Sequence, residues 1–102
     1  MKQKLLFENV KGFDWDDGNI KKNKIKHKVD IKEAERIFFN KPLIIIEDEG
    51  HSQKEKRHIA FGKTDKGRLL IAAFTIRDSR FRIISVRDQN KRERRYYDKA
   101  KN

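Results

Sequence analysis

Apolar residues alternate with arginines in FRIISVR (residues 81–87), and the segment before it, RLLIAAFTIR (residues 68–77), carries an arginine at each end. Successive side chains of a β-strand point to opposite faces of a sheet, so this alternation predicts half-buried strands. If Asp78 and Ser79 form a two-residue hairpin, the polar side chains gather on one face of the pair. That face carries Thr75, Arg77, Arg80 and Arg82. The opposite face then carries a core of Phe74, Ile76, Phe81 and Ile83.

The length of the turn decides which face Arg82 occupies. A three-residue turn would send Arg82 to the face of Phe74, because a slip of one residue exchanges the two faces of a strand. The sequence is compatible with both registers. We favour the two-residue turn because it gives the cleaner apolar core.

A face that carries several arginines and a hydroxyl is suited to phosphate. Guanidinium donors match phosphate oxygens bidentately. They also stabilise the extra negative charge that develops in a phosphoryl transition state. The alternative is a solvated face of an open sheet, with the arginine tips in water.

The chain offers few groups that could carry a proton. His27 ends a basic segment and could complement the dipole of a helix. His58 opens a strand and could donate or accept a proton, or it could simply face solvent. His51 lies among acidic residues, but no spacing typical of metal ligands surrounds it, so we expect no metal site. The acidic cluster of Asp14, Asp16 and Asp17 is better explained by helix capping than by a two-metal nuclease.

Helices and strands must position these side chains. Asp16 or Asp17 can cap a first helix that runs to about His27. Asp30 and Glu33 have the spacing of a capping box for a second helix, which Asn40-Lys41-Pro42 ends. The segments LIIIE, HIAFG, RLLIAAFTIR and FRIISVR then predict four strands. Asn90 and Glu93 offer a further capping box for a terminal helix, NKRERRYYDKA.

This order of elements predicts an α+β fold. It has two N-terminal helices, an antiparallel four-stranded meander sheet and a C-terminal helix, with the helices on one face. The segment GFDW could add an edge strand. Phe13 and Trp15 are expected in the core. Of Tyr96 and Tyr97, one is expected to pack and the other to meet solvent or RNA.

Length, charge and cysteine content limit the classes of protein to which the chain could belong. The chain has 102 residues, which predicts a single domain over residues 1–102. Lys plus Arg is 27 and Asp plus Glu is 16, a formal charge of +11 that favours a polyanionic partner. Cysteine is absent, which excludes disulfides and zinc–thiolate sites. No signal segment or apolar run of the about 18 residues needed to span a membrane is visible, so we expect a cytoplasmic protein without membrane contact.

The ordered pattern of residues also resembles the BrnT toxin family, from about Phe13 to Tyr97. The matching positions are Phe13, Trp15, Asp16, Asn23, Lys26, His27, Val29, Glu33, Ala34, Phe38, Glu55, Arg57, Gly62, Gly67, Arg68, Leu69, Leu70, Phe74, Thr75, Arg77, Arg82, Ile83, Ile84, Ser85, Arg87, Glu93, Arg94 and Tyr97. The resemblance implies a RelE-like fold and a metal-independent ribonuclease toxin of a type II toxin–antitoxin pair. Such a toxin cleaves RNA, arrests translation and needs no cofactor.

The resemblance also implies partners and site residues. The partners would be RNA and a BrnA-like antitoxin that masks the toxin, with operator DNA bound only through the antitoxin. We expect the catalytic arginines to be Arg57, Arg77 and Arg82. The expected RNA-binding residues are Lys26, His27, His58, Arg68, Thr75, Arg80, Arg87 and Tyr97.

Cleavage of RNA without a metal needs three things. The 2′-hydroxyl must lose a proton, the pentacoordinate phosphate must be stabilised and the 5′-oxygen must gain a proton. Arginines supply the second, and His58, Glu55 or Tyr97 could help with the others. A non-catalytic basic module that binds RNA or the ribosome explains the same charge and alternation. A DNA-binding regulator built on the first two helices ranks last, because no helix–turn–helix spacing is visible.

Overall fold

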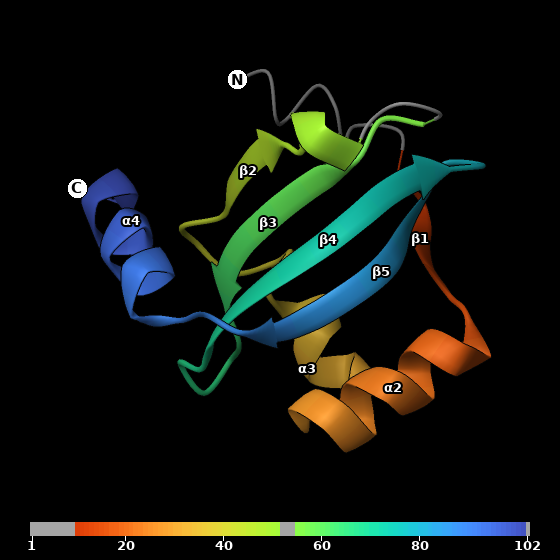
Figure 1. The fold of residues 1–102 in the computed structure, drawn as a ribbon, viewed down its shortest axis with the longest axis horizontal. Coiled ribbons are helices and arrows are strands. Elements are labelled where there is room, and N and C mark those ends of the chain that lie inside the picture. Colours follow the sequence, from red (N-terminus) through yellow and green to blue (C-terminus); the bar gives the residue numbers. More distant parts are fainter. Residues whose placement is uncertain (1–9, 52–54, 102) are drawn as a thin grey trace.

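The computed structural model describes residues 10–51 and 55–101. Figure 1 shows a twisted sheet with helices packed around it. In chain order the elements are β1 (Gly12–Trp15), α2 (Asp17–His27), α3 (Ile31–Arg36), β2 (Ile44–Glu47), the 3-10 helix η1 (Glu49–His51), β3 (His58–Lys63), β4 (Leu69–Arg77), β5 (Arg80–Asp88) and α4 (Lys91–Lys101). None of the helices in the described ranges is long and apolar enough to cross a membrane.

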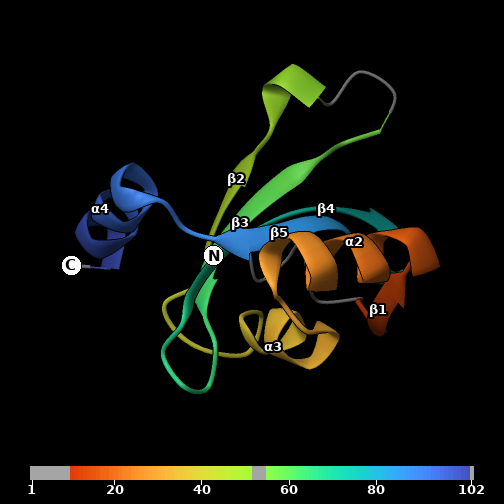
Figure 2. The same ribbon diagram turned by 60° about the horizontal axis from the view of Figure 1, so that its bottom comes forward.

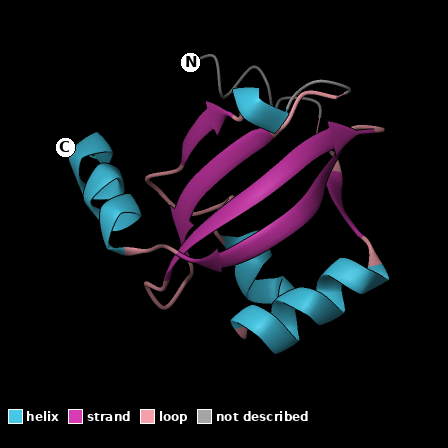
Figure 3. Cartoon of the chain, in the orientation of Figure 1, coloured by secondary structure: helices cyan, strands magenta, loops and turns pink. Residues whose placement is uncertain are grey.

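The sheet has five strands in the order β1-β5-β4-β3-β2. Strands β2 to β5 form the antiparallel meander that the sequence predicts (Figure 3). The prediction of a purely antiparallel four-stranded sheet is wrong, however, because β1 adds a parallel strand alongside Arg80–Ile83 of β5. A four-residue segment is too short to show a periodicity that would reveal its partner.

The helices cover both faces of the sheet, so the prediction that they lie on one face is also wrong. Ala34 and Ile37 of the α3 region pack with Leu70, Phe74 and other core residues on what we call the helix face. Tyr97 of α4 packs on the opposite face, and Figure 2 shows α4 well separated from α2 and α3. The reason is that β3 and β4 are apolar on both faces, so each face needs a cover.

Local signals set the ends of the helices as the sequence predicts. The Asp16 side chain accepts hydrogen bonds from the backbone N–H groups of Gly18 and Asn19. Asp30 and Glu33 form the predicted capping box of α3. Asn90 and Glu93 form the equivalent reciprocal pair at the start of α4.

The hairpin between β4 and β5 has the two-residue turn that we favoured. Both turn residues adopt left-handed backbone conformations, with φ of 53° at Asp78 and 62° at Ser79. Such turns match the twist of the flanking strands. Arg77 therefore pairs with Arg80 and Thr75 pairs with Arg82, which confirms the predicted register.

A β-bulge in β5 decides where Arg87 points. Ala73 pairs with Ser85 and Phe74 pairs with Ile83, so Ile84 is an extra residue on β5. Without the bulge, Arg82 and Arg87, which are five positions apart, would lie on opposite faces. With it, Thr75, Arg77, Arg80, Arg82 and Arg87 share one face, which we call the arginine face.

Candidate functional site

The centre of the arginine face is an ion pair between Arg77 and Glu55. Glu55 lies just before β3, and its two carboxylate oxygens accept from Arg77 Nη2 at 2.8 Å and from Arg77 Nε at 3.1 Å. This is the bidentate geometry in which a guanidinium binds a carboxylate or a phosphate. From the sequence, Glu55 was only one of three candidate proton carriers, and the structure brings it into direct contact with Arg77, a predicted catalytic residue.

The charge of Glu55 is fixed by its neighbours. The hydrogen bond from Arg77 lowers the pKa of Glu55 below its ordinary value, and the charges of Arg77 and Arg82 lower it further, while partial desolvation opposes them. The carboxylate is therefore ionised at neutral pH. Arg82 is close enough to influence Glu55, so two arginines and one carboxylate meet at this point.

Thr75 adds a buried hydroxyl to the same face. Its side chain is 4% exposed, and Oγ1 has no hydrogen-bond partner in the described part of the chain. Buried hydroxyl groups are normally satisfied. Thr75 lies across from Arg82 in the register of β4 and β5, so its buried hydroxyl is a polar group beneath the site.

Two further residues flank this centre. Asp14 of β1 pairs with Arg82 of β5, and its charge contributes to raising the pKa of Arg77. Arg57 directly precedes β3, and its carbonyl accepts from the backbone N–H of Asp48 at 2.8 Å. Continuing the alternation of β3 by one residue places the Arg57 side chain toward the arginine face. The place of Asp14 beside the arginines was not predicted, because helix capping accounted for the acidic cluster in the sequence.

Arg87 occupies the other end of the arginine face, beside α4. Its Nη1 and Nη2 donate to the two carboxylate oxygens of Glu93 at 2.7 and 2.9 Å. These hydrogen bonds lower the pKa of Glu93, so the pair is charged at neutral pH. Glu93 therefore both caps α4 and holds Arg87.

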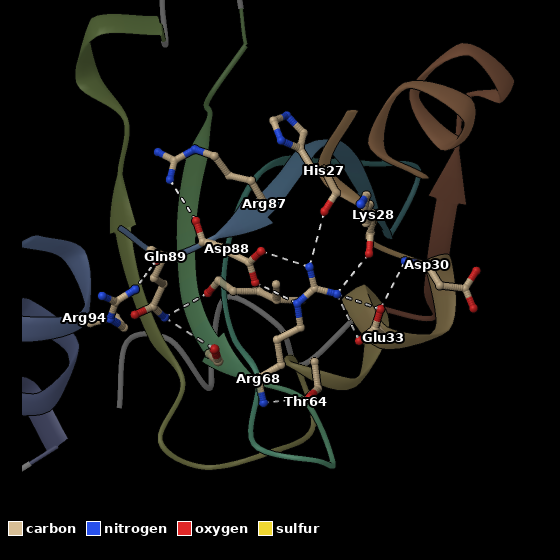
Figure 4. Close-up of polar contacts among 12 residues, drawn as sticks. His27, Lys28, Asp30, Glu33, Thr64, Arg68, Arg87, Asp88, Gln89 and Arg94 are labelled. Atoms are coloured by element: carbon tan, nitrogen blue, oxygen red, sulfur yellow. Dashed lines mark hydrogen bonds and ion pairs between the residues drawn. The ribbon is translucent and has the colours of Figure 1, made fainter. Parts of the chain in front are cut away.

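Arg68 has a different environment, which Figure 4 shows. Its guanidinium donates to both carboxylate oxygens of Asp88, with Nε at 2.7 Å and Nη2 at 3.0 Å. It also donates to Glu33 and to the backbone carbonyls of His27 and Lys28. These bonds tie the end of α2 and the start of α3 to the end of β5. Arg68 is thus committed to protein acceptors, and the structure does not bring it to Arg77 and Arg82.

The predicted RNA-binding pair Lys26 and His27 lies at the end of α2, which packs beside β5. Lys26 is exposed. Desolvation lowers the pKa of His27, and the charges of Lys26 and Arg87 lower it further. His27 is therefore neutral at pH 7 and lies near Arg87 (Figure 4), at the edge of the arginine face.

His58 and Tyr97 lie away from the central arginines. His58 is 8% exposed and stacks on Phe74, on the helix face, at a centroid distance of 5.3 Å. Burial lowers the pKa of His58. Tyr97 is 1% exposed and donates its hydroxyl hydrogen to the carbonyl of Pro42. Tyr96, which the predicted site omitted, is instead 45% exposed.

The arrangement as a whole suits a phosphodiester. Arg77 and Arg82 act on an ionised carboxylate, Arg80 pairs with Arg77 in the ladder of β4 and β5, and Thr75 lies at the base of the same face. Among the described residues, no group of three or more His, Cys, Asp or Glu side chains is placed to hold a metal ion.

Comparisons with known proteins agree on one family. Residues 15–93 match the family model described as the ribonuclease toxin BrnT of type II toxin–antitoxin systems. The crystal structure of the Brucella abortus ribonuclease toxin BrnT is similar in fold, with a TM-score of 0.60 and 18% sequence identity. The similarity covers 80% of this chain and 100% of that chain. No curated protein matches the sequence.

Proposed function

Because the chain belongs to the BrnT family of ribonuclease toxins of type II toxin–antitoxin systems, we propose that it cleaves RNA without a metal at the Glu55–Arg77–Arg82 centre and so arrests translation in the cytoplasm. The observation that carries this proposal is the bidentate Arg77–Glu55 pair beside Arg82 and the unpaired Thr75 hydroxyl. Two anion-binding groups, Arg77 and Arg82, thus lie beside a proton acceptor, Glu55.

The reaction is a transfer of the phosphoryl group within RNA. The 2′-oxygen attacks the adjacent phosphorus, the bond to the 5′-oxygen breaks, and a 2′,3′-cyclic phosphate and a 5′-hydroxyl result. Glu55 accepts the proton of the 2′-hydroxyl, and water supplies the proton that the leaving 5′-oxygen needs. As the phosphate enters, Arg77 keeps its pair with Glu55 through Nε and Nη2 and presents Nη1 to the phosphate oxygens.

Charge stabilisation carries more of the rate than proton transfer does. A carboxylate with a lowered pKa is a weak base. Arg77 and Arg82 are always charged and approach from neighbouring strands, so they can bind the non-bridging oxygens as negative charge develops. Arg57 belongs to the same centre in this proposal, and Arg80 and Arg87 bind the flanking phosphates.

The toxin's antitoxin partner is proposed to be a BrnA-like protein. The arginine face is strongly basic, so an acidic segment of an antitoxin would complement it and exclude RNA from it. Operator DNA would be bound through the antitoxin alone.

Single and double variants of Arg77 and Arg82 test this site. Removing one donor that stabilises a developing oxyanion costs about 10²- to 10³-fold in rate. We expect Arg77→Ala and Arg82→Ala each to lower the RNA cleavage rate by about that factor, with circular dichroism and thermal melting little changed. Growth arrest on expression should be relieved in parallel.

Arg36→Ala is the matched control. Arg36 is also an exposed arginine in an ion pair, with Asp65 at 2.9 Å, but it lies on α3. This variant should cleave RNA at the wild-type rate. If the Arg77→Ala, Arg82→Ala double variant cleaved RNA as fast as the wild type, the site assignment would be wrong. Tight RNA binding by the wild type without any cleavage would favour a non-catalytic binding module.

A further inference from the structure

A small apolar groove lies between strand β2 and helix α4. It has a volume of about 270 Å³ and is lined by Ile46, Phe61, Arg92, Glu93 and Tyr96. Two of its apolar side chains are unusually exposed, Ile46 at 40% and Tyr96 at 45%. Large exposed apolar side chains that cluster at one point mark a site of interaction.

The aromatic ring of Tyr96 forms one side of this groove. The Tyr96 ring lies 5.0 Å from the Phe61 ring, centroid to centroid, with 48° between their planes. The next residue, Tyr97, is buried and donates its hydroxyl hydrogen to the carbonyl of Pro42. Helix α4 is therefore anchored by Tyr97, and Tyr96 offers an aromatic surface that remains partly exposed.

The charge around the groove is positive. Arg92 lines it, one helical turn before Tyr96 on α4. Arg87 lies next to it and neutralises Glu93 through a bidentate pair. A ligand that fits must therefore combine an apolar, planar part with negative charge. An unpaired nucleotide has both, whereas an apolar protein side chain would fill the groove but bring no anion to Arg92.

The groove also lies on the arginine face. Phe61 pairs with Ile71 of β4, and Ile46 pairs with Ile59 of β3. Ile71 pairs with Arg87, and Thr75 is four residues further along β4, which is about 13 Å at the rise of a strand. A single-stranded RNA that follows β4 and β5 would thus pass from Thr75, over Arg87, to the groove.

We propose that this groove binds an unpaired nucleobase of the RNA substrate, which stacks on Tyr96 while Arg92 and Arg87 contact the adjoining phosphates. Stacking on aromatic side chains tolerates any base, so the groove contributes affinity and sets the position of the strand. This inference rests on the proposed function for the identity of its ligand, since it places a second contact of the same RNA away from the cleavage centre.

Fluorescence of a stacked base tests this inference. The probe is a short oligonucleotide that is fully 2′-O-methylated, so it cannot be cleaved, with 2-aminopurine placed at each position in turn. Stacking on Tyr96 should quench the fluorescence of 2-aminopurine at one or two positions only. Tyr96→Ala should weaken binding by about 10- to 100-fold and abolish that quenching, and Tyr96→Phe should restore both.

Phe39→Ala is the matched control, because Phe39 is a 63% exposed aromatic residue that contacts Phe13 and Arg36 rather than the arginine face. It should bind and quench as the wild type does. If Tyr96→Ala bound the oligonucleotide and quenched 2-aminopurine as the wild type does, the inference would be overturned. So would a Tyr96→Ala variant that loses affinity for a purified antitoxin but not for the oligonucleotide, since the groove would then be a protein-docking site.

The two proposals fail in different ways. The uncleavable probe measures binding alone, so the Arg77→Ala, Arg82→Ala double variant should still show Tyr96-dependent quenching. If the wild type failed to cleave RNA, the proposed function would be wrong, but the quenching of 2-aminopurine would still test whether the groove binds a base. If the wild type cleaved RNA but 2-aminopurine were quenched at no position, only the proposal that the groove binds a nucleobase would be wrong.

Discussion

The ionised state of Glu55 connects the geometry of the site to a pH dependence. A general base works best when its pKa is close to the operating pH. Arg77 and Arg82 hold the pKa of Glu55 below its ordinary range, so the carboxylate is fully available at neutral pH but accepts protons weakly. Residues that stabilise Glu55 as an anion therefore limit its strength as a base, which leaves most of the acceleration to the arginines.

The pH dependence of RNA cleavage follows from this shift. A carboxylate with a lowered pKa is ionised above its ordinary pKa and is protonated only as the pH falls through the lower, folded-state value. We therefore expect that protonation of Glu55 does not lower kcat/KM for a short RNA between pH 8 and about pH 5. Glu55→Gln should lower the rate by about 100-fold across this range.

A variant of His58 tests whether this histidine contributes to the pH dependence. His58 stacks on Phe74 on the helix face, so His58→Gln should leave both the rate and the profile unchanged. An inflection of kcat/KM near pH 6 to 7 that disappears in His58→Gln would contradict the assignment of Glu55 as the proton acceptor.

At the residue level, the sequence predicts which side chains matter better than it predicts what each one does. The alternation of arginines placed Thr75, Arg77, Arg80 and Arg82 on one face, and the register confirms this. The role of Arg68 could not be read in the same way. Its acceptors include Glu33 and Asp88 and lie 20 to 41 positions away in the sequence, so only the folded chain brings them together.

At the level of elements, the short-range signals were reliable and the long-range ones were not. Caps and the Asp78-Ser79 turn depend on neighbouring residues, and the sequence predicts them. The parallel pairing of β1 and the position of α4 depend on which faces need covering after the meander has formed. The bulge at Ile84 has no sequence signal of its own, yet it determines that Arg87 joins the arginine face.

The end of α3 lies so close to the sheet that a side chain larger than that of Gly62 should destabilise the fold. A Cβ atom at this position would lie 2.9 Å from Ile37 Cβ and 3.0 Å from the Ile37 carbonyl oxygen. Real Cβ atoms essentially never come within 3.0 Å of another atom, so Gly62→Ala must shift Ile37, at the end of α3, away from β3. We expect the free energy of unfolding to fall by about 1 to 3 kcal/mol in urea titrations.

Gly12→Ala is the control for that substitution. Gly12 is also in a strand, but nothing lies within 4 Å of the position that its Cβ would occupy. Its effect on unfolding should stay within about 0.5 kcal/mol. Equal effects of the two substitutions would mean that α3 does not pack on β3 as described.

For the whole molecule, the formal charge of +11 determines how RNA is held. Counterions are released when cationic side chains neutralise phosphates, so log Kd for RNA should depend linearly on log salt concentration. Contacts from Arg77, Arg80, Arg82, Arg87 and Arg92 predict a slope of magnitude about 3.5 with a single-stranded, uncleavable oligonucleotide.

Removing one contact should change that slope by a defined amount. Arg82→Ala should reduce it by about 0.7, whereas Arg36→Ala should leave it unchanged. Titrations of fluorescence anisotropy at several salt concentrations measure both. A slope near zero in the wild type would show that binding does not use the arginine face.

Cleavage of RNA in the presence of EDTA is the most direct test of the central claim, which is metal-independent cleavage at the arginine face. The purified protein should cleave a short RNA at an unchanged rate in excess EDTA and leave a 2′,3′-cyclic phosphate and a 5′-hydroxyl. The 2′-O-methyl form of the same RNA should remain intact. Loss of cleavage in EDTA that is restored by added Mg²⁺, or cleavage of the 2′-O-methyl form, would contradict the mechanism.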